Sequence, residues 1–167
     1  EKEGEQGSYL PGSSSGSSRT TSTCLLPLQS LVMSSVHDAH HILRATAART
    51  LGVLISTPVF RTDDFFVANA ARSLCQLLGE DPNMTVRIRA CWALANLFDV
   101  LALLVEGGTG TKIDAGQSIS VSLFQDIVRT GVKAAQDSDK VRASAMRLLG
   151  NAMRWRPNDT EMLQMVA

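Results

Sequence analysis

The apolar residues between positions 81 and 104 recur every three or four places, which is the spacing of one face of an α-helix. Polar residues fall on the opposite face, together with a tryptophan. Asp81-Pro82-Asn83 supplies a helix start directly before the pattern. The segment is therefore predicted to be a half-buried helix whose apolar face carries Val86, Ala90, Leu94, Leu97 and Leu101.

The core of this pattern occurs three times along the chain. Val86-Arg87-x-x-Ala90-x-x-x-Leu94 reappears 55 residues later as Val141-Arg142-x-x-Ala145-x-x-x-Leu149. It also occurs 43 residues earlier as Leu43-Arg44-x-x-Ala47-x-x-x-Leu51. Copies of one helical pattern at intervals of tens of residues predict a stacked array of repeats, because a single repeat cannot bury its apolar face alone.

The segments between the copies also show helical periodicity, interrupted by proline, glycine and acidic helix starts. Thr57-Pro58 is expected to end one helix, Asp63-Asp64 to begin the next, and Gly79 to end that one. The predicted fold class is all-α, an α-solenoid of about three helical hairpins and a truncated last helix. The helices are expected at 24–36, 39–55, 63–78, 81–104, 118–136 and 137–155.

Composition divides the chain into two parts. Residues 1–22 are mostly Ser, Gly, Thr and Glu with little to bury, so we expect them to be disordered. Residues 23–167 form the repeat part, in which a flexible Gly-rich insertion at 106–117 explains the longer interval between the last two copies. The start at Glu1 and the apolar run at the other end lead us to expect a piece of a longer protein.

Charge and cysteine content narrow the classes of function. Sixteen basic and sixteen acidic residues cancel, so no overall charge favours nucleic acid or a membrane surface. The apolar run 24–36 is too short to span a bilayer. Cys24, Cys75 and Cys91 lack the spacing of a metal or disulfide framework and are expected to be buried free thiols. Free thiols indicate a reducing compartment, so we expect an intracellular protein of the cytoplasm, the nucleus or both.

No part of the sequence pairs a nucleophile with a base, so we expect neither an enzyme nor a cofactor. His37 and His41 would hold a metal only if one helix ran through both, and no Cys or Glu completes the set. The run from Gly107 to Lys112 lacks the residue order of a phosphate-binding loop. No catalytic, cofactor-binding or metal-binding residue is assigned.

The spacing of acidic and basic residues resembles that of the HEAT repeat. Asp38/Arg44 and Asp81/Arg87 show an Asp-x5-Arg pattern that is similar to the one in the second helix of HEAT repeats. In the third copy Asp137 stands only five residues before its arginine, which departs from the pattern. The resemblance implies a right-handed superhelix of stacked hairpins, an Asp–Arg ladder between successive repeats, and no catalytic residues.

Two further stretches add to this resemblance. The run from Cys91 to Asn96 resembles the Trp-x-x-x-Asn helix of armadillo repeats. Residues 136–151 resemble the carboxyl-terminal part of the HEAT repeat-containing protein 6 family. The chain is thus similar to HEAT/armadillo-type repeat proteins over roughly residues 24–167.

The polar faces of the second helices are predicted to line the concave side, where solenoids bind partners. Asparagines there would bond an extended peptide's main chain, arginines would attract acidic side chains, and a tryptophan would pack against an aliphatic one. Two alternatives stay open: Trp92 lies in the seam between repeats under Arg49 or Arg147, and the asparagines bond between repeats. The candidate partner-binding residues are Arg49, Arg89, Trp92, Asn96, Arg147, Asn151 and Arg154.

The resulting hypothesis is a non-enzymatic scaffold whose partner is another protein, bound through an extended acidic segment. A transport-receptor-like reader of basic signals is a second hypothesis, although such signals need an acidic groove. A nucleic-acid-facing solenoid is a third, and a strong salt dependence of binding would favour it. We do not expect a nucleic acid, a membrane or a small molecule as partner. The third hypothesis depends on basic residues of the last hairpin, namely Lys140, Arg142, Arg147, Arg154 and Arg156.

Overall fold

The computed structural model describes residues 17–106, 119–156, 159–160 and 164. Over these residues the chain is entirely helical and has no strand, so the all-α prediction is confirmed. The expected hairpins are present. The helices are α1 (Ser17–Ser35), α2 (His41–Ser56), α3 (Pro58–Arg61), α4 (Asp64–Glu80), α5 (Met84–Glu106), α6 (Val121–Ala134) and α7 (Asp139–Trp155).

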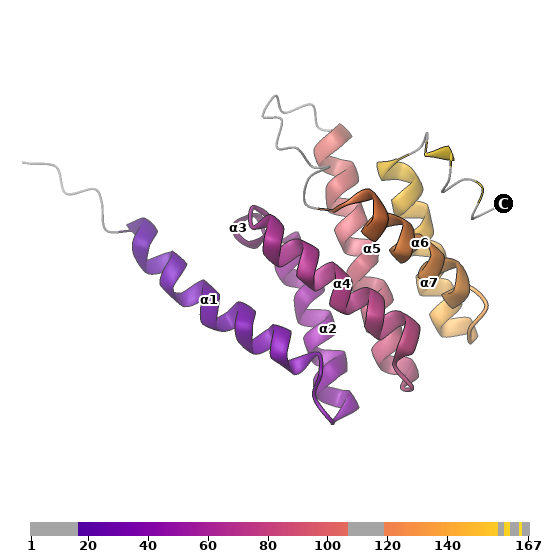
Figure 1. Ribbon diagram of the computed structural model, residues 1–167, viewed down its shortest axis with the longest axis horizontal. Coiled ribbons are helices and arrows are strands. Elements are labelled where there is room, and N and C mark those ends of the chain that lie inside the picture. The colour runs from indigo at the N-terminus through magenta and orange to yellow at the C-terminus, as the bar shows by residue number, and fades with distance from the viewer. Residues whose placement is uncertain (1–16, 107–118, 157–158, 161–163, 165–167) are drawn as a thin grey trace, which may run out of the picture.

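The helices form two layers (Figure 1). Helices α2, α5 and α7, the second helices of the three hairpins, lie side by side in one layer, and α1, α4 and α6 form the other. The second helices contact one another far more extensively than α4 contacts α6. In a solenoid the more closely packed layer lies on the inner side, so we expect the second helices to line the concave side here.

Local sequence explains most helix ends. Asp63 caps α4 by accepting a hydrogen bond from the Phe66 N–H at 3.0 Å, and Ser120 caps α6 by accepting one from the Leu123 N–H at 3.2 Å. Helix α2 stops before Pro58, which then begins the single turn of α3. That short turn was not predicted, because proline was read only as a stop.

Three boundary predictions are wrong. Helix α1 begins at Ser17, inside the segment 1–22 that we expected to be disordered, because adding residues to an existing helix costs far less than starting one. Gly79 lies inside α4, which continues to Glu80. Glu106, assigned to the insertion, is the last residue of α5. The rest of both segments, residues 1–16 and 107–117, lies outside the part of the chain that the structure describes.

Helix α5 is the centre of the core. It packs against α2, α4 and α7, and Val86, Ala90 and Leu94 on its predicted apolar face are fully buried. By length and composition α5 alone among the described helices could cross a membrane, yet half of its most apolar window is buried inside this fold. Its apolar character follows from contact with three other helices.

An aromatic cluster fills the core between the second and third hairpins. The ring of Phe98 stacks on Trp155 with centroids 5.5 Å apart, and Phe124 meets both rings edge-on at 5.6 and 5.3 Å. The Arg156 guanidinium covers the outer side of Trp155 at 4.6 Å. Such ring geometries add to the stabilisation that comes from burying the area alone.

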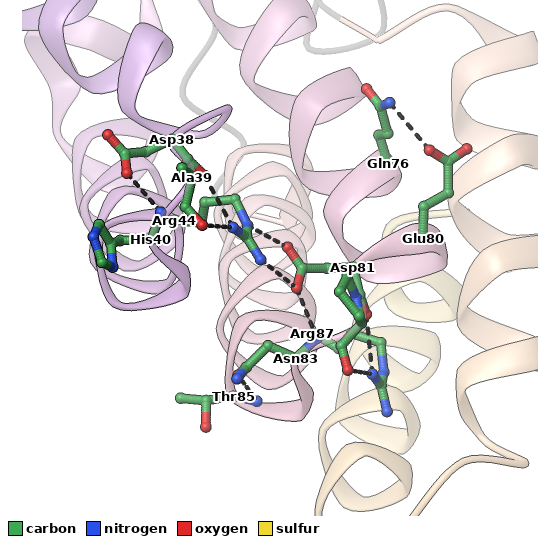
Figure 2. Close-up of polar contacts among 11 residues, drawn as sticks. Asp38, Ala39, His40, Arg44, Gln76, Glu80, Asp81, Asn83, Thr85 and Arg87 are labelled. Atoms are coloured by element: carbon green, nitrogen blue, oxygen red, sulfur yellow. Dashed lines mark hydrogen bonds and ion pairs between the residues drawn. The ribbon is translucent and has the colours of Figure 1, made fainter.

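A ladder of ion pairs joins successive hairpins at one end of the second helices (Figure 2). Arg44 donates from Nε to Asp81 at 2.6 Å and from Nη2 at 3.0 Å, which is a two-point contact. A third Arg44 hydrogen bond reaches the Asp38 carbonyl at 2.9 Å. The Asp81 side chain is only 3% exposed, so this pair is desolvated on its acidic side.

The next rung repeats this arrangement. Arg87 contacts Asp137 at 2.8 and 3.1 Å and donates to the Asp81 carbonyl at 3.0 Å. The unusual spacing in the third copy does not prevent this rung. The Asp137 carboxylate accepts hydrogen bonds from Arg87 of the preceding hairpin. The number of residues between Asp137 and Arg142 therefore has no effect on this rung. The ladder that the resemblance implied is therefore present.

The carboxylates of the ladder stay ionised below their usual range. Burial by itself would raise the pKa of Asp81, but hydrogen bonds from Arg44 and from the Asn83 N–H outweigh it and the pKa is lowered. The pKa of Asp137 is lowered by the hydrogen bond from Arg87 and then by that from the Ser138 N–H. Both groups therefore stabilise the fold in their ionised form.

Helices α2 and α5 approach closely at a glycine. A Cβ atom on Gly52 would lie 2.8 Å from the Ala93 Cβ, 2.9 Å from the Ala93 Cα and 3.1 Å from the Trp92 ring. The Ala93 backbone cannot yield without moving α5. In the third copy the equivalent residue is Gly150, where a Cβ would meet nothing within 4 Å.

We predict that Arg44→Ala lowers the free energy of unfolding by about 3–5 kcal/mol, because it strands the buried Asp81 carboxylate. Arg142→Ala is the matched control: Arg142 is 52% exposed and its partner Asp139 is 94% exposed, so the loss should be at most about 1 kcal/mol. Urea unfolding measures both. The stabilisation from the ionised Asp81 is present above the ordinary pKa of an aspartate and disappears as the pH falls through the lowered pKa of Asp81. The free energies of unfolding of the wild-type chain and of Arg44→Ala should therefore converge in acid.

We also predict opposite effects of one substitution at two equivalent positions. Gly52→Ala should destabilise the fold by about 1–3 kcal/mol because the helices must separate, even though alanine favours helix. Gly150→Ala should stabilise it by up to about 1 kcal/mol, since the propensity gain meets no clash. The melting temperatures of the two variants, each compared with that of the unchanged chain, test this prediction. Equal shifts of the same sign would contradict the close approach of α2 and α5.

Candidate partner-binding surface

The outward side chains of α2, α5 and α7 form one continuous surface, which we call the second-helix face. Each of them is at least partly exposed, as expected for Trp92, Asn96, Asn151 and Arg147. Binding of a partner by these residues stays a prediction. The face consists of Thr46, Arg49, Val53, Thr85, Arg89, Trp92, Asn96, Asp99, Lys140, Ser144, Arg147, Asn151 and Arg154.

Trp92 occupies the seam between two hairpins and the surface at once. It is half-buried, packs against the core, and sits over Gly52, whose missing side chain leaves room for the ring. The cation–π contacts found among the described residues belong to Arg156, not to Arg49 or Arg147. Trp92 is therefore a partly exposed seam residue with no arginine stacked on it.

The two candidate asparagines already bond between repeats. Asn151 donates from Nδ2 to the Ala95 carbonyl at 2.8 Å, and the Asn96 Oδ1 accepts from Arg147 at 3.1 Å. The alternative in which the asparagines bond between repeats is thus correct for the Asn151 amide N–H and for the Asn96 Oδ1. Asn151 therefore links α7 to α5, because its amide N–H is already used in the hydrogen bond to the Ala95 carbonyl.

Arg154 belongs to an internal ion-pair cluster. It contacts Asp99 at 2.8 Å and Glu106 at 2.8 Å, and the hydrogen bond from Arg154 lowers the pKa of Glu106. Its charge is neutralised by two carboxylates of α5. Of the residues predicted to attract an acidic partner, Arg154 is therefore the least suited to do so.

Four cations of the second-helix face remain without an ion pair among the residues that the structure describes. Arg147 contacts only the Asn96 amide, and for Arg49, Arg89 and Lys140 the described residues provide no carboxylate. The carboxylates of these helices have other partners: Arg154 holds Asp99 and Glu106, and Arg142 pairs with Asp139. The face is thus net basic, as the sequence predicted.

Arg49 and Arg89 meet across a cleft that sequence reasoning missed. The cleft has a volume of about 350 Å³ and lies between the amino-terminal halves of α2 and α5. The sequence contained a signal for it, because Arg49 stands five places after the ladder arginine Arg44 and Arg89 stands two places after Arg87. The cleft is lined by His41, Ile42, Ala45, Thr46, Arg49, Thr85 and Arg89.

Metal-binding and thiol chemistry find little support in the described residues. No three His, Cys, Asp or Glu side chains gather there, and the chain between Ser35 and His41 is not helical, so His37 and His41 do not share a helix face. Burial raises the pKa of the Cys91 thiol to about 12, which keeps it protonated and unreactive at neutral pH. Cys75 is half-buried, and the side chain of Cys24 lies outside the described residues.

The basic residues of the last hairpin are mostly engaged within the protein. Arg142 pairs with Asp139 and bonds the Ala135 carbonyl at 3.1 Å, while Arg156 stacks on aromatic rings. With Arg154 also paired, Lys140 and Arg147 are the members left for a nucleic-acid backbone. A surface that contacts many phosphates needs more free cations than this.

Comparison with known proteins agrees with this architecture. Residues 41–97 match the family described as HEAT-like repeat. The chain is 33% identical over 135 residues, or 81% of its length, to an uncharacterized protein of Dictyostelium discoideum, of which it spans only 8%. No solved structure matches it. The chain therefore contains a HEAT-like repeat region, which includes the α2–α5 seam and its first ladder rung.

Proposed function

We propose that this chain is a non-enzymatic, protein-binding part of a larger HEAT-like solenoid. Its second-helix face would hold an extended acidic segment of another protein. HEAT-like repeats commonly serve as interaction scaffolds, and the face supplies cations, an exposed aromatic ring and amide groups on three adjacent helices.

One observation carries the proposal: within the described part of the chain, Arg49, Arg89 and Arg147 have no carboxylate partner, although they share helices with fully paired arginines. An unpaired guanidinium on a concave surface attracts acidic ligands from a distance and bonds carboxylates in a two-point geometry. The ladder arginines Arg44 and Arg87 are mostly buried and paired with carboxylates, so they do not compete for the ligand.

The spacing of the helices sets the length of the ligand. Packed helices lie about 8–10 Å apart, and an extended chain rises about 3.3 Å per residue. One helix therefore corresponds to about three ligand residues. Acidic side chains about six residues apart would reach Arg49 on α2 and Arg147 on α7, with an apolar side chain over Trp92 between them.

The other hypotheses are weaker on the same evidence. A reader of basic localisation signals needs acidic residues on the second-helix face, where Asp99 is already held by Arg154. A nucleic-acid-facing role would use the last hairpin, where arginines are turned to internal partners.

Two further points belong to the proposal. The parent protein is of the HEAT repeat-containing protein 6 type, on the strength of the stretch 136–151, and it works inside the cell, in the cytoplasm, the nucleus or both. The buried, protonated Cys91 supports the second point, since a thiol of this kind persists in a reducing compartment.

Peptide selection tests this function. Linear peptides selected from a random library on the 167-residue chain should be rich in Asp and Glu, with an aliphatic residue between the acidic ones. Arg147→Glu should weaken the selected peptides about tenfold or more and flatten the dependence of binding on salt. Fluorescence anisotropy at two salt concentrations measures both.

The control is Arg129→Glu, which changes an exposed arginine of α6 in the other layer. It should leave peptide binding unchanged. Selection of neutral or basic peptides, or equal losses in the two variants, would contradict an acidic ligand on the second-helix face.

A further inference from the structure

We propose that the cleft between α2 and α5 is a phosphate-binding subsite, which takes the phosphorylated serine or threonine side chain of the bound partner. The inference rests on the proposed function, because the cleft is one end of the second-helix face. It adds a modification state of the partner that the acidic-segment hypothesis alone does not require.

The charge of the cleft is the first argument. Arg49 of α2 and Arg89 of α5 line it, His41 is also among its lining residues, and none of these residues is acidic. The nearest ladder carboxylate, Asp81, is buried under Arg44 and turned away from solvent. Both arginines therefore line one space of about 350 Å³, and the described residues that line it include no carboxylate to neutralise them.

The choice of phosphate over carboxylate follows from charge and donor number. A phosphoserine carries about −1.5 to −2 charges and three acceptor oxygens, which matches two guanidiniums that each offer a fork of donors. A carboxylate has one charge and would leave one arginine uncompensated. Thr85 adds a hydroxyl, whereas the Thr46 hydroxyl already donates to the Ile42 carbonyl at 2.8 Å.

The helix ends at the cleft add to its positive potential. Helices α2 and α5 both begin beside the cleft, and the N-cap residue of α2, His40, makes no side-chain cap, although its own N–H donates to the Asp38 carboxylate at 2.7 Å. The positive ends of both helix dipoles then point toward the same region. This effect only supports the two arginines, since a helix start by itself does not select a ligand.

The equivalent seam between α5 and α7 lacks the arginine pair. The repeat alignment places Trp92 where α2 has Arg49, and Ser144 where α5 has Arg89. A general feature of the fold would appear at both seams. The pair is therefore specific to the α2–α5 seam, with the phosphate at that end of the ligand.

The test uses a short fluorescein-labelled peptide of Gly, Asp and Leu that carries one central phosphoserine, with serine and aspartate versions. The phosphoserine version should bind the 167-residue chain about tenfold or more tighter than the serine version, with the aspartate version between them. Arg49→Ala and Arg89→Ala should each remove most of this preference. Arg147→Ala should weaken all versions equally and keep the preference.

Arg72→Ala is the matched control, because Arg72 is exposed on α4 and bonds only the Asn69 side chain. It should change nothing. Far-ultraviolet circular dichroism of every variant separates loss of binding from loss of fold. Equal affinities for phosphoserine and serine, or a preference that survives both Arg49→Ala and Arg89→Ala, would overturn the subsite while leaving the acidic-segment function intact.

If none of the peptide versions binds, the proposed function itself is refuted, and a second measurement then tests the subsite alone. Inorganic phosphate is then titrated into the ¹⁵N-labelled chain while the arginine Nε–Hε signals are followed. Shifts confined to Arg49 and Arg89 support the subsite, and their absence overturns it. Tighter binding of a single-stranded oligonucleotide through the same two arginines would overturn the phosphorylated protein as its ligand.

Discussion

The buried carboxylate of Asp81 is the point on which the stacking of the repeats depends. It accepts two hydrogen bonds from Arg44 of the preceding hairpin and one from the Asn83 N–H. The backbone carbonyl of Asp81 accepts a further hydrogen bond from Arg87. A desolvated carboxylate costs several kcal/mol unless it is paired in this way. Sliding the first hairpin along the second would break both Arg44–Asp81 bonds together, so the register of α2 against α5 is set here.

The ladder also decides which charges remain for function. Asp81 and Asp137 face Arg44 and Arg87 across the seams and are unavailable to neighbouring cations. The Arg154 cluster uses Asp99 and Glu106 in the same manner. Among the residues that the structure describes, Arg49, Arg89 and Arg147 therefore lack a carboxylate because the acidic side chains are used to hold the stack together.

The seam and the surface are coupled through small residues. Gly52 lets α5 approach so closely that the Trp92 ring lies over it, and the ring is thereby fixed in orientation with part of it exposed. A rigid, half-exposed ring loses little conformational freedom on binding, which favours its use as a contact for a partner. The same close approach brings Arg49 and Arg89 to the two sides of one cleft.

The sequence by itself determined the helices and the repeat, and its resemblance to HEAT repeats implied the ladder. Helical periodicity, the three aligned copies and the Asp–Arg spacing depend on local chemistry and on positions along the chain, which a sequence displays directly. It also showed that the second-helix face is basic. It did not show that α1 extends back to Ser17 or that Pro58, which ends α2, also begins a turn, because the first depends on the low cost of lengthening a helix and the second on the fit of proline in a first helical turn.

Only the tertiary structure decided which of the polar residues on that face are free. Asn151 bonds the Ala95 carbonyl and Arg154 bonds two carboxylates of α5, whereas Arg49 and Arg89 share a cleft without one. These pairings join residues some fifty positions apart, and they depend on the rotation and spacing of α5 against its neighbours. Spacing along one helix places a side chain on a face, but the adjacent helix determines whether its charge is already neutralised.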